Sequence, residues 1–386
     1  MKQQTATRSK AMKIVYKGIL LTGLIPCVSF AAPAVTGTSG SLSTGNTAVI
    51  SGSGFGTHTM QVESLQNYIE AGTVGQKFAK TGWTQSDWTW ASPMYATDAS
   101  HSGNKSLKCT VNSNNSYNCA FAYIMPNPVK AGNKFYASWW VKYNGDTNGQ
   151  WKMFKLKQKE TIIDNPMEFV FFNWFSMQQQ AHGADSNNVG YGIWPNENTI
   201  PKGDNKWYRF EFEMNAGTTG SSNGSFTIRT TTDTGTIYEE RSTGNRTHAA
   251  NADEWRYAIW QNYIGNGINS AVIHFDDIYV QTGTQARVEL CSGSTWAKRG
   301  KCEIQIPTSW NASSIPVTVN TGNFSSGSSA YLYVVDSSGT ANSSGYQVSV
   351  GGTSSGGGTS SGGGTSTPDP SPASAPAPQL SSITVQ

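Results

Sequence analysis

Short runs of alternating apolar and polar residues, separated by turn-forming residues, occupy most of the chain. The runs are rich in Val, Ile, Tyr, Phe, Trp and Thr, and Gly, Asn, Ser and Asp stand between them. No stretch keeps the period of an amphipathic helix, so the pattern predicts an all-β protein. The clearest predicted strands are Ser106–Val111, Phe135–Tyr143, Trp151–Lys157, Met167–Met177, Trp207–Met214, Ser225–Thr231 and Val272–Val280.

The run Trp207–Met214 predicts a strand with one apolar and one polar face. The apolar set, predicted to face the core, is Tyr208, Phe210, Phe212 and Met214. The polar set is Trp207, Arg209, Glu211 and Glu213. Such a face suits a sugar, because aromatic planes stack on pyranose rings while charged groups bond hydroxyls. The alternative is an outer face in contact with water.

The run Trp151–Lys157 adds cationic groups. Strict alternation places Lys155 and Lys157 on one face with Trp151 and Met153. Together with Lys142 and Arg209 these lysines could neutralise an acidic sugar. The alternative is an edge strand that lysines keep soluble.

Glu168 interrupts a run, Met167–Met177, that is apolar on both faces apart from Glu168, Asn173 and Ser176. The run predicts a central strand covered on both sides. A carboxylate there is costly unless it is paired or used, which makes Glu168 a candidate catalytic residue.

Residues 1–31 predict a secretory signal peptide. A basic stretch precedes an apolar run, and small residues follow at Ser29 and Ala31, the −3 and −1 positions of a signal peptidase site. The apolar run is too short to span a bilayer, so we expect a secreted protein without a membrane span. Cleavage would leave 22 basic and 24 acidic residues. That balance argues against a nucleic-acid partner, which needs a concentrated basic surface.

Four cysteines follow the predicted cleavage site, in two close pairs. In an oxidising compartment the simplest connectivity joins Cys109 to Cys119 and Cys291 to Cys302, each stapling a hairpin. A metal site built from these cysteines is disfavoured, because CxxC spacing and accompanying histidines are absent.

The C-terminal residues have the composition of a disordered linker. Residues 351–378 are rich in Gly, Ser and Thr and then in Pro, and neither part can bury a core. Only residues 379–386 follow. We therefore expect either a further module beyond this linker or a spacer to the cell surface.

The segments on either side of the centre resemble parts of one small domain. Residues 33–56, which end in Gly-Ser-Gly-Phe-Gly, resemble the opening strands of an IPT/TIG immunoglobulin-like domain, and residues 285–350 resemble its remainder. This resemblance implies a small β-sandwich into which residues 57–283 are inserted. The alternative is two unrelated flanking pieces.

Residues 57–283 resemble jelly-roll carbohydrate modules of the concanavalin-A-like group, which includes polysaccharide lyases and glucanases. The motifs that carry the resemblance are Ser102–Lys108, Tyr136–Tyr143, Lys206–Met214 and Ile273–Val280. The resemblance implies a two-sheet sandwich with a concave face that holds a sugar chain. It indicates a fold and a substrate class, and no single activity.

Such modules often hold a structural calcium ion near the final strand. Asp276 and Asp277, with Glu70 or Glu63, could supply several of the six to eight oxygens that calcium takes. Turn chemistry and catalysis are the alternatives for the two aspartates. No organic cofactor is expected.

Two catalytic schemes remain open. Glu211 and Glu213 could serve as the carboxylate pair of an endo-glycosidase, although the Glu-x-Asp-x-x-Glu strand of laminarinase-like enzymes is absent. A polysaccharide lyase would instead abstract a uronate proton while a cation neutralises the carboxylate. The candidates for that proton transfer are Tyr143, His182, Tyr191, Tyr263 and His274.

The sequence therefore favours a secreted protein that recognises polysaccharide. The predicted substrate-binding residues are Trp139, Lys142, Trp207, Arg209, Lys155 and Tyr263. One alternative is a lyase or glycoside hydrolase acting on an extracellular, acidic polysaccharide. The other is a non-catalytic structural or adhesin role at the cell surface.

Overall fold

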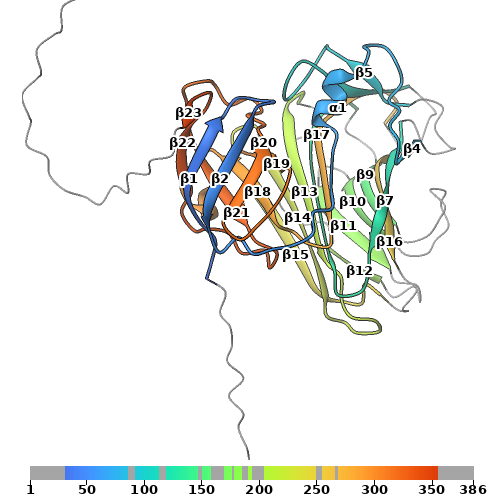
Figure 1. Ribbon diagram of the computed structural model, residues 1–386. Coiled ribbons are helices and arrows are strands. Elements are labelled where there is room, and N and C mark those ends of the chain that lie inside the picture. Colours follow the sequence, from blue (N-terminus) through green and yellow to red (C-terminus); the bar gives the residue numbers. More distant parts are fainter. Residues whose placement is uncertain are drawn as a thin grey trace, which may run out of the picture. The chain divides into compact units, whose positions relative to one another are not determined.

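The computed structural model describes residues 31–85, 92–112, 119–146, 150–157, 169–175, 178–184, 190–193, 204–248, 254–265 and 268–354. Regular structure within these ranges is almost entirely β-strand, which confirms the predicted fold class (Figure 1). The helices described are α1 (Gln66–Ala71) and the 3-10 helix η1 (Trp296–Lys298). No helix in the described part of the chain is both long and apolar enough to cross a membrane.

Within the described residues, an antiparallel sheet of eight strands, here named sheet I, forms one layer of the central module. Its order is β15-β14-β13-β8-β17-β6-β5, and β3 pairs with β17 beside this path. The strands are β3 (Val62–Ser64), β5 (Met94–Ala96), β6 (Ser106–Val111), β8 (Lys134–Gly145), β13 (Trp207–Asn215), β14 (Gly224–Thr232), β15 (Ile237–Asn245) and β17 (Ala271–Thr282).

The other layer of the central module, sheet II, has seven strands in the described part of the chain. Its order is β12-β11-β10-β9-β16-β7-β4. The strands are β4 (Trp83–Gln85), β7 (Phe121–Val129), β9 (Gln150–Lys157), β10 (Phe169–Phe175), β11 (Gln178–Ala184), β12 (Gly190–Ile193) and β16 (Trp255–Gly265). All seven strands predicted above are present, with small differences at the ends that the structure describes; residues 167, 168, 176 and 177 of the fourth lie outside the described part of the chain.

Aromatic side chains fill the space between the two sheets. Trp139 of sheet I stacks on Phe154 of sheet II, with 4.8 Å between ring centroids, and meets Trp260 edge-on at 5.9 Å. All three side chains are fully buried. Two sheets packed face to face over one apolar core form a β-sandwich.

The flanking segments form a second, smaller sandwich, here named the flanking sandwich. Among the described residues its strand path has the order β22-β21-β18-β19-β20-β2-β1-β23. The strands are β1 (Ala34–Ser41), β2 (Thr47–Ser53), β18 (Arg287–Cys291), β19 (Cys302–Pro307), β20 (Ser314–Thr318), β21 (Ser329–Val335), β22 (Tyr346–Ser349) and β23 (Thr353–Ser354).

Strands from before and after the central module share this path and one core. β2 pairs with β20, so the blue and orange strands of Figure 1 lie side by side although the whole central module separates them in sequence. Ile50 of β2 and Ile315 of β20 belong to the same fully buried cluster. Where the central module begins and ends, Ser64 of β3 lies opposite Tyr279 of β17, and the Thr282 N–H donates to the Gln61 carbonyl at 3.1 Å.

Both disulfides predicted from cysteine spacing are confirmed. Cys109 bonds to Cys119, and Cys291 bonds to Cys302. The first disulfide does not staple a hairpin as predicted, because Cys109 lies on β6 of sheet I and Cys119 precedes β7 of sheet II. Cys291 and Cys302 lie directly opposite one another on β18 and β19, so the second disulfide fastens two neighbouring strands of the flanking sandwich.

Replacing both Cys291 and Cys302 by serine is expected to lower the free energy of unfolding by about 3 kcal/mol, because the disulfide restricts the unfolded chain. Urea unfolding of the oxidised protein and of the double variant measures the difference. Reductant should lower the midpoint of the wild type more than that of the double variant, because the variant has already lost this disulfide. An unchanged midpoint in the double variant would contradict the prediction.

Candidate functional site

Both faces of β13 are buried. The apolar residues Tyr208, Phe210, Phe212 and Met214 belong to the core between sheets I and II, as the alternation predicts. On the opposite face Arg209 and Glu211 are each only 1% exposed. The cover comes from β18 and β19 of the flanking sandwich, since Arg209 donates through Nη1 to the Glu289 carboxylate and the Cys302 carbonyl, both at 3.1 Å. The polar face of β13, which was predicted to contact either a sugar or water, is therefore covered by the flanking sandwich.

Arg209 stands at the centre of a layer of buried charges. Its Nε donates to the Ser138 hydroxyl at 2.9 Å, and its Nη2 donates to the Tyr136 hydroxyl at 3.0 Å. Glu289 accepts a second guanidinium, through a 2.5 Å contact between its Oε1 and the Arg287 Nε. Four of the five N–H groups of Arg209 are thus bonded, by β8 of sheet I and by β18 and β19 of the flanking sandwich.

Glu211 is held as a carboxylate within this layer. Its Oε1 accepts from the Tyr136 hydroxyl at 2.9 Å and from Nη1 of Arg229 at 3.1 Å. Burial by itself would raise the pKa of Glu211, but the guanidinium groups of Arg209 and Arg229 outweigh it and hold that pKa well below its ordinary value.

The catalytic candidates named from sequence do not form an acid–base pair in this geometry. A glycosidase needs one carboxyl that keeps its proton for the leaving oxygen. Glu211 is ionised, and Glu213 accepts from Arg229 at 3.3 Å and from Arg287 at 3.2 Å. Glu168 lies outside the described residues.

The predicted binding residues on sheet I divide into two groups. Trp139 is part of the core and has no exposed surface. Trp207 and Lys142 are half-buried and lie directly opposite one another on β13 and β8. Lys142 also pairs with His274 of β17, whose ring lies 6.5 Å from that of Trp207. The structure therefore brings Trp207 and Lys142 together and separates both from Trp139.

Three lysines of β9 occupy one face of sheet II, named here the lysine face and defined by Lys152, Lys155 and Lys157. Trp151 and Met153 belong to the core instead, so the prediction that they share a face with Lys155 and Lys157 is wrong. The reason is a β-bulge: the register with both neighbouring strands shifts at Met153, and this reverses the alternation on either side of it. The bulge brings Lys152 to the same face as the other two lysines.

Cross-strand partners extend the lysine face. On β16, Tyr257 lies opposite Lys157 and Tyr263 lies opposite Lys152. On β10, Asn173 lies opposite Lys152 and Phe171 opposite Lys155. Positions directly opposite in an antiparallel pair share a face of the sheet.

The ladder continues to β11, where Gln180 pairs with Asn173 and His182 pairs with Phe171. Of the residues predicted for sugar contact or proton transfer, positions 155, 182 and 263 therefore share this face. Sequence reasoning did not find Lys152, because only the bulge shows which side it takes, or Tyr257, because only the pairing of β16 with β9 places it opposite Lys157.

The remaining lyase candidates lie elsewhere. The Tyr143 hydroxyl donates to the Asp146 carbonyl, and the Tyr143 ring is buried in the core of the module. Burial lowers the pKa of His274 to about 4, so this imidazole is neutral near pH 7, and its Nδ1 lies 2.9 Å from the Ser106 hydroxyl. Tyr191 pairs with Gly183 rather than with a position of the lysine face.

The carboxylates predicted to bind calcium instead hold the backbone of one loop. Asp276 Oδ2 accepts the backbone N–H groups of His101 at 2.8 Å and Ser102 at 3.2 Å. Glu70 accepts those of Asn104 at 3.1 Å and of the next residue at 3.0 Å. The loop can approach Glu70 because Gly103 has a φ of +59° and its missing Cβ would stand 2.4 Å from the Glu70 carboxylate.

Asp276, Asp277 and Glu70 therefore do not form one shell of donors. Calcium takes six to eight oxygens, whereas among the described residues the cluster of possible metal ligands around Asp277 joins it to His101 and Glu303. The other such cluster contains the bonded cysteines of the Cys291–Cys302 disulfide, which offer no thiolate.

No protein-family model matches the chain, and no curated protein matches it. Among solved structures it is similar to the PL-14 alginate lyase of Aplysia kurodai, with 13% identity, a TM-score of 0.39, and 48% of this chain and 86% of that chain covered. For the alginate lyase vAL-1 from Chlorella virus the values are 12%, 0.38, 49% and 89%. For the binding domain of botulinum neurotoxin serotype G they are 10%, 0.34, 65% and 68%. Similarities of this size assign neither an activity nor a substrate.

Proposed function

We propose that this protein is secreted and binds an anionic polysaccharide on the lysine face of sheet II. The observation that carries the proposal is the row of Lys152, Lys155 and Lys157 on one face, with Tyr257 and position 263 directly opposite on β16. The charged face of β13 supports no such role, because the flanking sandwich covers it.

The chemistry of the lysine face suits a chain of acidic sugars. Ammonium groups spaced along one strand can neutralise successive carboxylates or sulfates, and tyrosine rings can stack on the apolar faces of the sugar rings. Lys155 is 3% exposed and Lys157 is 1% exposed. Both of them already make a contact within the protein, and Lys152 is the half-buried lysine of the three.

The same face favours a lyase over a glycosidase as the catalytic alternative. Removal of the proton next to a uronate carboxyl needs a cation at that carboxyl and a base beside it. Lys157 and Tyr257, which lies directly opposite it on β16, are the described pair that could supply this cation and this base. In the glycosidase scheme Glu211 cannot be the carboxyl that retains its proton, because neighbouring arginines hold its pKa well below its ordinary value.

Replacing Lys152 by Ala is expected to weaken polysaccharide binding about tenfold, with a further loss at high salt, because one of three charges is removed from a partly exposed site. Affinity gels containing alginate, pectate or a neutral glucan measure the retardation. Lys298→Ala, an exposed lysine of the flanking sandwich, is the matched control and should bind as the wild type does.

The outcomes separate the three functions. Retardation by acidic gels without product supports a binding protein, and an unsaturated product absorbing in the ultraviolet supports a lyase. Binding that is unchanged in the Lys152→Ala variant would rule out the lysine face as the site. Failure of the wild type to bind any glycan would reject the proposal and favour a structural or adhesin role.

A further inference from the structure

A histidine and two carboxylates from distant parts of the chain meet between sheet I and the flanking sandwich. His101 lies in the loop after β5, Asp277 on β17 and Glu303 on β19. One ligand atom from each lies within 4.8 Å of the others. The His101 side chain has no exposed surface, and that of Glu303 is 1% exposed. This cluster belongs to neither the ion pairs of Arg209 nor the lysine face.

His101 and Glu303 are each held by the protein through one of their two polar atoms. His101 Nδ1 lies 2.8 Å from Asp277 Oδ2, and the imidazole stacks on Trp140 with 3.7 Å between ring centroids. Glu303 Oε2 accepts the indole N–H of Trp140 at 3.0 Å. These contacts leave His101 Nε2 and Glu303 Oε1 facing one another.

These two facing atoms are buried without a hydrogen-bond partner. They lie 3.6 Å apart, which is too long for a hydrogen bond. Two ligands of one tetrahedral metal ion stand at a similar separation, about 3.4 Å for bonds of about 2.1 Å. A buried donor or acceptor that is left unpaired destabilises the folded protein. A ligand bound between His101 Nε2 and Glu303 Oε1 would remove this cost.

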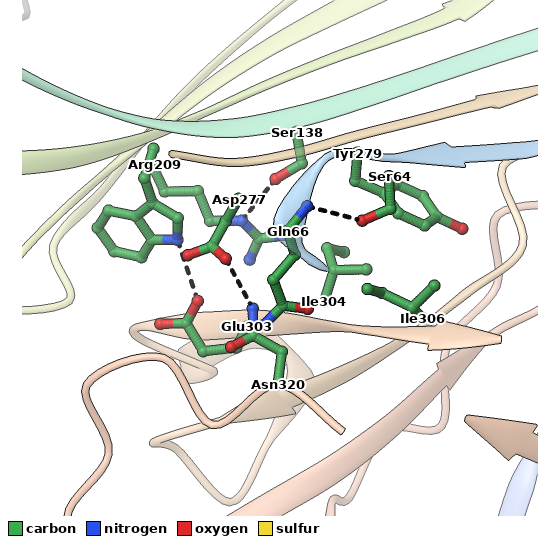
Figure 2. Close-up of a pocket in the computed structure, with 11 residues that line it drawn as sticks. Ser64, Gln66, Ser138, Arg209, Asp277, Tyr279, Glu303, Ile304, Ile306 and Asn320 are labelled. Carbon is green, nitrogen blue, oxygen red and sulfur yellow. Dashed lines mark hydrogen bonds between the residues drawn. The ribbon is translucent and has the colours of Figure 1, made fainter. Parts of the chain in front are cut away.

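The surroundings favour a cation as that occupant. In the described part of the chain, neither Asp276, Asp277 nor Glu303 forms an ion pair with a lysine or an arginine. Asp277 and Glu303 also line, together with Arg209, a cavity of about 10 Å³, enough for one ion or water molecule. Gln66 lines it too, and its amide oxygen and nitrogen are buried without partners. Figure 2 shows the Asp277 and Glu303 carboxylates and the Gln66 amide around the same space.

We propose that His101 Nε2 and Glu303 Oε1 bind one divalent transition-metal ion of the zinc class, with the Gln66 amide oxygen as a further donor. Asp277 is then the positioning residue: it accepts the Nδ1–H of His101 and so aims Nε2 at the ion, the arrangement common to metal-binding histidines. An imidazole nitrogen suits zinc and its neighbours, whereas calcium and magnesium take oxygen ligands. The ion joins β19 of the flanking sandwich to the loop of the central module.

Zinc titration of the mature chain, stripped with chelator and dialysed, tests the proposal. Calorimetry should show one Zn²⁺ bound per chain, and saturating Zn²⁺ should raise Tm by about 5 °C because only the folded protein assembles the ligands. Chelator should reverse the rise. Absence of stoichiometric binding by the wild type, or stabilisation by Ca²⁺ and not by Zn²⁺, would overturn the proposal.

The zinc affinities of variants test which residues bind the ion. Glu303→Gln keeps an oxygen for Trp140 and can donate an amide N–H to His101 Nε2, so we expect it to fold without metal and to bind zinc at least ~100-fold more weakly. Asp277→Asn should weaken binding about 10–100-fold, as expected for a positioning residue. Glu70→Gln, a substitution on α1 at the carboxylate that bonds the same loop outside the cluster, should bind as the wild type does. Wild-type zinc affinity in Glu303→Gln would overturn the assignment.

Discussion

Replacing Arg209 by Ala is expected to destabilise the protein by about 3–5 kcal/mol, because it leaves Glu289 and Glu211 buried beside fewer positive charges. Arg209 donates to Ser138, Tyr136, Glu289 and the Cys302 carbonyl, and its side chain is 2% exposed. The loss therefore combines an unpaired buried charge with several unsatisfied hydrogen-bonding groups. Urea unfolding measures it.

The matched control is Arg241→Ala, an exposed arginine on β15 of the same sheet, for which we expect a change within about 0.5 kcal/mol. A double-mutant cycle with Glu289→Ala should show a coupling of about 1–3 kcal/mol, since the second substitution removes one of the carboxylates that the first leaves unpaired. A loss below about 1 kcal/mol in Arg209→Ala would mean that this buried layer contributes little to stability.

Acid is expected to destabilise the protein steeply once the pH falls below about 4.5, the ordinary pKa of a glutamate. Burial would raise the pKa values of Glu211 and Glu289, but neighbouring arginines lower both. A carboxyl with a lowered pKa in the folded state binds fewer protons there than in the unfolded state. Its contribution to stability is therefore present above the unfolded pKa and is lost as the pH falls through the folded one.

Denaturant midpoints between pH 7 and pH 2 test this expectation. Glu211→Gln should be less stable than the wild type at pH 7 and should lose less on acidification, because its amide does not titrate. Glu239→Gln serves as the control: its partly exposed side chain also accepts from Arg229, at 2.7 Å, and the variant should follow the wild-type pH profile closely. Parallel profiles for the wild type and Glu211→Gln would show that Glu211 is not a source of acid sensitivity.

Local signals in the sequence predicted the strands and both disulfides. Alternation in Trp207–Met214 correctly separated the core residues from the polar ones, because side chains on a strand alternate strictly. Cysteines about ten residues apart bonded within their pairs, on two adjacent strands for Cys291 and Cys302 and between the two sheets for Cys109 and Cys119. Each signal is contained within a short stretch of the chain.

The placement of the polar residues depended on contacts that the sequence does not display. Arg209 bonds Glu289, 80 residues away, so alternation revealed a polar face but not the strand that covers it. On β9 the bulge at Met153 changed which side Lys152 takes, and no residue in that run marks it. His101 was not a predicted site residue, because its partners Asp277 and Glu303 lie on separate strands far along the chain.

The pairing of β3 with β17 has a consequence for engineering. Because Thr282 bonds Gln61 across this pair, the chain leaves the flanking sandwich and returns to it at neighbouring points. A short designed turn could therefore join these two points after deletion of the central module, and other domains with adjacent termini could be inserted at the same junction. The flanking sandwich would then act as a scaffold for exchangeable inserted domains.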